Sequence, residues 1–117
     1  MYETRTITDT IGHVVLLSVD PNGQLGIART DVDKEQVIVL TKRDAHILHA
    51  FLQRAAAMGK APHPGEVLGN MTHLDLVTEP PMVVLKNETA TIELHAPGWS
   101  AVACEIGLLL PRLDELS

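Results

Sequence analysis

The histidines are the side chains of this chain that could most readily do chemistry, because an imidazole titrates near neutral pH and binds transition metals. Six are present, at His13, His46, His49, His63, His73 and His95. His46 and His49 are three positions apart, which places both on one side of a helix. No acid or third histidine at helical spacing completes a ligand set, and Lys42 and Arg43 beside the pair would repel a cation. We therefore expect no metal and no other cofactor.

His63 and His73 carry a second possible chemistry. His63 stands between Pro62 and Pro64 in the long connection 59–72, and His73 follows that connection directly. A histidine held by flanking prolines suits a general base, so a small enzyme that uses these loop histidines is one hypothesis. The simpler interpretation is a pair of surface histidines, and the sequence names no substrate class.

Cys104 is the only cysteine, which excludes a disulfide within the chain and suits a reducing compartment. A nucleophilic cysteine needs a helix N-terminus or a cationic neighbour to lower the pKa of its thiol. Cys104 falls in the middle of a predicted helix and is followed by Glu105. It therefore reads as a small apolar residue, and without a catalytic constellation we expect a protein that is not an enzyme.

Strand and helix signals place these side chains in two similar halves. Apolar runs bounded by turn residues predict strands, which we assign to residues 11–19, 24–30, 36–40, 73–77, 82–85 and 89–95. Thr41 is a suitable N-cap for a helix that runs to Met58 and stops at Gly59, and Pro97 suits the first turn of a closing helix. Pro111 is expected to end or kink that closing helix.

The predicted fold class is therefore α+β. Two β-hairpin or meander units, each followed by a helix, form an antiparallel sheet with two helices packed on one face. Residues 1–117 are expected to be a single domain with pseudo-repeat halves 11–58 and 73–116, joined by the loop 59–72, after an extended lead-in over residues 1–10.

The two halves share their apolar spacing. Aligning Leu40 on Leu94 places Ala45 on Trp99, Leu48 on Val102, Leu52 on Ile106 and Ala55 on Leu109. An ancient duplication and convergence on the same packing both explain this register.

Surplus apolar surface predicts self-association. The strand 36–40 reads as buried, and the strand 11–19 offers apolar side chains to both faces of a sheet, whereas two helices cover only one face. The closing helix is apolar on its far side as well as on its core stripe, and such a helix is usually buried all round. We expect a homo-oligomer whose interface includes Val15, Leu17, Ala101, Cys104 and Leu108. The alternative is a monomer in which the loop 59–72 covers the sheet and the closing helix lies across the first helix.

A basic cluster supports a nucleic-acid alternative, with cations at Lys42, Arg43, Arg54 and Lys60 on the outward side of the first helix. The order of elements over residues 11–110 is similar to that of the PC4-like, PUR-like and Whirly modules, a resemblance that implies binding of single-stranded nucleic acid. Two physical facts oppose it. The chain carries 9 Lys and Arg against 15 Asp and Glu, a net charge of −6, and the predicted strands contain no aromatic residue on which a base could stack.

The leading functional hypothesis is a small non-enzymatic protein-binding or regulatory module of inhibitor or accessory type. We expect a protein partner together with self-association, and a nucleic-acid partner is disfavoured by the charge. The first ten residues lack the apolar segment of a signal peptide, and no apolar run approaches the length of a membrane span. We therefore expect a cytoplasmic protein with no membrane partner.

Overall fold

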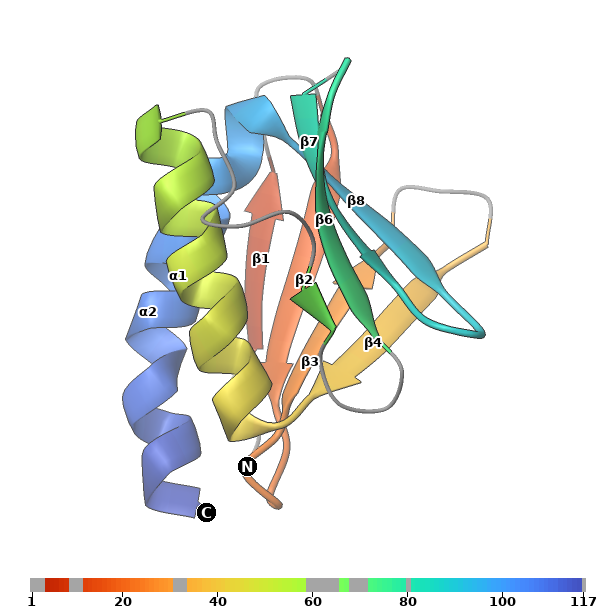
Figure 1. The fold of residues 1–117 in the computed structure, drawn as a ribbon. Helices are drawn as coiled ribbons and strands as arrows, with labels where there is room; N and C mark the ends of the chain where they lie inside the picture. Colours follow the sequence, from red (N-terminus) through yellow and green to blue (C-terminus); the bar gives the residue numbers. More distant parts are fainter. Residues whose placement is uncertain are drawn as a thin grey trace.

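The computed structural model shows two four-stranded antiparallel sheets, each followed by a long helix (Figure 1). It describes residues 4–8, 12–30, 34–58, 66–67, 72–79 and 81–116. The first half contains β1 (Thr4–Thr8), β2 (Val14–Val19), β3 (Leu25–Arg29), β4 (Gln36–Leu40) and α1 (Lys42–Met58). The second contains β5 (Glu66–Val67), β6 (His73–Thr78), β7 (Pro81–Lys86), β8 (Thr91–His95), the short 3-10 helix η2 (Ala96–Gly98) and α2 (Trp99–Leu116).

The predicted α+β class, with two strand-plus-helix halves, is confirmed. In each half the strands pair in chain order, so each sheet is a meander. The halves form two sheets rather than one continuous sheet. The lead-in also differs from expectation, because β1 pairs with β2 along its whole length, from Thr4 opposite Ser18 to Thr8 opposite Val14.

Local side chains fix the first hairpin turn and the start of α1. Oδ1 of Asp20 accepts hydrogen bonds from the backbone N–H groups of Asn22 at 2.9 Å and Gln24 at 3.0 Å. Gly23 adopts the positive φ of 77° that this hairpin requires. At the start of α1, Oγ1 of Thr41 accepts from the N–H of Asp44 at 3.2 Å, which is the predicted N-cap. Gly59, the expected stop of this helix, lies outside the described residues.

Pro111 does not end the closing helix, since α2 continues through it to Leu116. Leu109 and Leu113, on either side of the proline, are both fully buried. Burial of these side chains stabilises the last turn more than the lost backbone hydrogen bond destabilises it. Of the two outcomes expected at Pro111, a stop or a kink, the stop is therefore wrong.

The two helices lie side by side and antiparallel, and α2 also packs on β1 and β2 (Figure 1). The sheets approach each other where β4 meets β8. A hydrogen bond of 2.6 Å from Nη1 of Arg29 to the carbonyl of Glu93 joins them there. At the start of α2, the indole N–H of Trp99 donates to the carbonyl of Leu94 at 2.6 Å.

A single hydrophobic core draws on both halves. Every position in the predicted repeat register is buried in both halves, namely Leu40 and Leu94, Ala45 and Trp99, Leu48 and Val102, Leu52 and Ile106, and Ala55 and Leu109. The shared apolar spacing therefore marks buried positions in both halves.

The first sheet buries mainly one face. Along β4, Ile38 and Leu40 are buried, whereas Val37 and Val39 are each 47% exposed. The expectation that this strand is buried was therefore half wrong. Successive side chains of a strand point to opposite faces, and only the face toward α2 belongs to the core.

Candidate functional site

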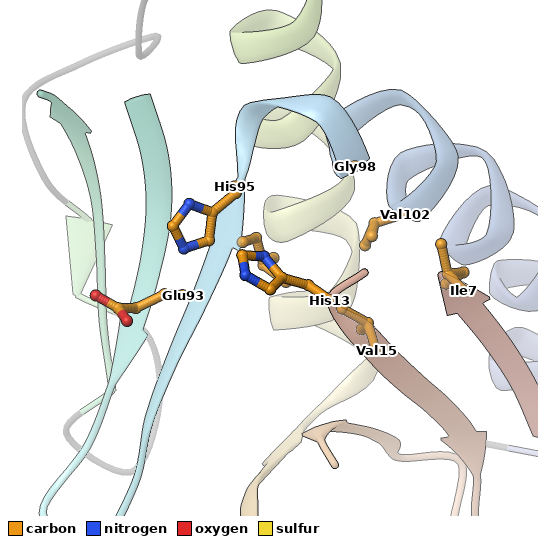
Figure 2. Close-up of a pocket in the computed structure, with 8 residues that line it drawn as sticks. Ile7, His13, Val15, Glu93, His95, Gly98 and Val102 are labelled. Carbon is orange, nitrogen blue, oxygen red and sulfur yellow. The ribbon is translucent and has the colours of Figure 1, made fainter. Parts of the chain in front are cut away.

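Two histidines that sequence reasoning did not pair meet at the junction of the two halves (Figure 2). His13 directly precedes β2, and His95 is the last residue of β8. Their ring centroids lie 4.4 Å apart, with the ring planes tilted by 53°. Because the residues are far apart in the sequence, no local pattern could have predicted this contact.

The cavity beside these rings is small. It holds about 10 Å³ and is lined by Ile7, His13, Val15, Glu93, Leu94, His95, Gly98 and Val102 (Figure 2). That volume is about the room of one water molecule, so no organic substrate fits. In Figure 2 the carboxylate of Glu93 points away from both imidazoles. We interpret this junction as a structural contact between the halves.

The side chains of His46 and His49, the two residues considered as metal ligands, each contact α2. Nε2 of His46 lies 3.4 Å from Oδ1 of Asp114. His49 is half-buried against Gly107, and burial, followed by the nearby His46, lowers the pKa of its imidazole. Among the residues that the structure describes, no group of three or more His, Cys, Asp or Glu side chains is placed to hold a metal ion.

Only one of the two loop histidines, His73, belongs to the described part of the chain. His63 lies outside the described residues. His73 is exposed at the start of β6, opposite Lys86 of β7. No catalytic arrangement involving His73 follows from this position.

The outward side of the helices carries the larger part of the predicted interface. Ala101, Cys104 and Leu108 are exposed on α2, and the side chain of Leu108 is 54% exposed. Beside them an open hollow of about 510 Å³ lies between the helices, and we call it the helix groove. Its lining residues are Gln53, Ala56, Ala57, Ser100, Ala103 and Cys104. They are uncharged and, apart from Gln53, small, so the groove suits contact with apolar side chains.

Val15 and Leu17, the other predicted interface residues, lie in the core with 6% and 0% of their surface exposed. They are therefore not available to a partner in this fold. On β2, Val14 and Leu16 point to the opposite face and are half-buried. Alternation along a strand predicts two faces, but the sequence alone does not say which of them is covered.

The uncovered side of the first sheet is a second candidate surface, which we call the outer sheet face. Its members are Thr4, Thr6, Thr8, Val14, Leu16, Ser18, Gly26, Ala28, Val37 and Val39, of which Ala28 is buried and Val14, Leu16, Ser18 and Gly26 are half-buried. None of these residues is charged. The side chain of Ser18 fills the space above Gly26, because a Cβ added to Gly26 would lie only 2.7 Å from Oγ of Ser18.

The predicted basic cluster is only partly described. Lys42, Arg43 and Arg54 are exposed on α1, and Nη1 of Arg54 lies 3.8 Å from Sδ of Met58. Lys60 is outside the described residues. The outer sheet face has neither a cation nor an aromatic ring, so it lacks the stacking platform that single-strand binders use.

No helix within the described residues combines the length and the apolar character needed to cross a membrane. Comparison with protein-family models and with curated proteins finds no match for the sequence.

Proposed function

We propose that this protein is a non-enzymatic protein-binding or regulatory module of inhibitor or accessory type, which works as a homo-oligomer. The observation that carries the proposal is the helix groove with the exposed side chain of Leu108 beside it. Exposed apolar side chains beside a concave surface are typical of protein interaction sites.

The groove favours a particular kind of partner. Ala56, Ala57 and Ser100 have short side chains, so a partner backbone can approach the helices closely. An amphipathic segment that presents one apolar face fits such a surface. Because Leu108 is 54% exposed, burial of its remaining surface would contribute about 1–1.5 kcal/mol to binding.

The experiment is affinity capture of protein partners with the tagged chain from its native lysate, with one half of each sample treated with nuclease. We expect a stoichiometric protein that survives the nuclease and is lost with Leu108→Asp. Thr91→Asp adds the same charge at an exposed position of β8, opposite Lys86, and is expected to retain the partner.

Two results would contradict this function. If Leu108→Asp captures the same protein as the wild type, the groove is not the binding site. Nucleic acid on the column, with every bound protein lost after nuclease, would instead support the alternative of single-stranded nucleic-acid binding. The exposed cations Lys42, Arg43 and Arg54 of α1 are what favours that alternative.

A further inference from the structure

We propose that the open edge of β1 is the self-association site of this protein, where β1 of a second copy adds antiparallel about a two-fold axis. The first sheets of the two copies then form one continuous sheet. The inference rests on the homo-oligomer in the proposed function and names the edge that forms it. It leaves the helix groove free for a different protein.

The hydrogen bonds of β2 show which of its main-chain groups turn toward β1. The carbonyl of Val14 accepts from the N–H of Thr30 at 3.4 Å, and the N–H of Asp20 donates to the carbonyl of Gln24 at 3.1 Å. Even-numbered residues of β2 therefore bond toward β3. Because main-chain groups alternate between the two sides of an antiparallel strand, the odd-numbered residues of β2 bond toward β1.

The same alternation identifies the main-chain groups that β1 leaves open. The residues of β1 opposite the odd-numbered positions of β2 are Arg5 and Ile7, so these two bond with β2. β1 forms one end of the first sheet, and no strand among the described residues pairs with its other side (Figure 1). The N–H and C=O groups on that side belong to Thr4, Thr6 and Thr8.

The open edge of β1 lacks the features that usually keep an edge strand from pairing with another chain. Such edges normally carry an outward charge, a proline or a bulge. Thr4, Thr6 and Thr8 are exposed, uncharged and β-branched, which favours strand pairing. The one charged residue of β1 is Arg5, and its Nε lies 3.6 Å from Oε2 of Glu105 on α2.

The edge of β8 is treated differently in the same molecule. The N–H of Thr91 donates to Oε1 of Gln36 at 3.0 Å, and the carbonyl of Glu93 accepts from Nη1 of Arg29 at 2.6 Å. Side chains of the first sheet thus occupy main-chain groups that β8 would otherwise offer to another strand. In the described part of the chain, β1 has no comparable cover.

The order of the open groups favours a second copy as the added strand. With Thr6 opposite Thr6 of the second copy, Thr4 lies opposite Thr8, and every open N–H and C=O group of both strands gains a partner. In this register Arg5 lies opposite Ile7, so the two arginines are not directly opposed. Paired threonines are themselves a favourable cross-strand contact.

The test is sedimentation velocity of the full chain over a concentration series, from below micromolar to near millimolar. The wild type is expected to pass from monomer to dimer. Thr6→Pro removes the central N–H, which the two-fold axis uses twice, and is expected to weaken the dimer by about tenfold or more. Thr6→Lys sets two ammonium groups opposite each other and is expected to act in the same direction.

Thr6→Val is the matched control, because it keeps the N–H and the branched shape, and its dimer is expected to stay within about threefold of the wild type. Thr6 is exposed and its N–H points away from β2, so circular dichroism and thermal unfolding should show that the variants are folded. Amide hydrogen exchange followed by NMR locates the contact. The N–H of Thr6 is expected to exchange more slowly as the protein concentration rises.

A wild type that stays monomeric at the highest concentration, or a folded Thr6→Lys dimer as tight as the wild type, would overturn this assignment. So would a monomer whose partner capture is lost with Thr6→Pro, because the edge would then accept a strand of another protein. The proposed partner binding fails separately. If Thr6→Lys dissociates the dimer but the wild type captures no protein, the β1 edge stands and the helix groove loses its assigned role.

Discussion

His49 and Gly107 are packed against each other across the interface between α1 and α2. A Cβ built on Gly107 would lie 3.0 Å from Nε2 of His49, closer than side chains normally approach. Glycine within a helix costs about 1 kcal/mol relative to alanine. The contact explains why α2 has a glycine at this position, because the imidazole of α1 occupies the space of a side chain.

Replacement of Gly107 by alanine should therefore depend on His49. In the wild-type chain, the gain in helix propensity is expected to be cancelled or reversed by the crowded imidazole. With His49→Ala present, Gly107→Ala should stabilise the fold by about 1 kcal/mol, which gives a coupling energy of about 1–2 kcal/mol. Urea denaturation of the four proteins measures it, and the same stabilisation in both backgrounds would contradict the packing.

The stability of the fold should also fall in mild acid because of His49. Burial, and then the nearby His46, lower the pKa of His49 below its usual 6.5, so the unfolded chain takes up this proton at a higher pH than the folded chain does. The stabilising contribution is complete above about pH 6.5 and is lost as the pH falls through the lowered folded pKa.

Denaturant midpoints measured between about pH 7.5 and about pH 5 check this sign. His49→Gln should flatten part of the acid-side fall, whereas His73→Gln, which removes an exposed imidazole of β6, should leave it in place. If the two variants follow the same curve, His49 is not the group responsible.

Arg29 should be important for holding the two sheets together. Its side chain is 6% exposed, and Nη1 donates to the carbonyl of Glu93 at 2.6 Å. Arg29→Met keeps much of the apolar volume but removes the charged donor, and is expected to lower the free energy of unfolding by about 1.5–3 kcal/mol.

Arg112→Met provides the matched control for this prediction. Arg112 forms an exposed pair with Glu115 at 3.3 Å within α2, and such pairs contribute little. The control is expected to cost less than about 0.5 kcal/mol in urea denaturation. If the two variants lose the same free energy of unfolding, the hydrogen bond from Arg29 to Glu93 contributes no more to stability than an exposed ion pair.

The site was less predictable than the fold. Ala101, Cys104 and Leu108 were placed on the outward side of a helix from the period of that helix, and they lie there. On β2, alternation marked two faces without saying which one is covered, so the expected interface residues Val15 and Leu17 are in the core. Pro111 was expected to end or kink the closing helix, and the helix instead continues to Leu116 with Leu113 buried.

The sequence by itself determined the local structure of this protein. The cap at Thr41, the turn at Asp20 and the apolar period of each helix act between residues that are close in the chain, so they can be read without the fold. Only the tertiary structure decided which face of the first sheet is open, and that His13 meets His95. These contacts join residues that are distant in the chain, and they depend on how the two halves share one core.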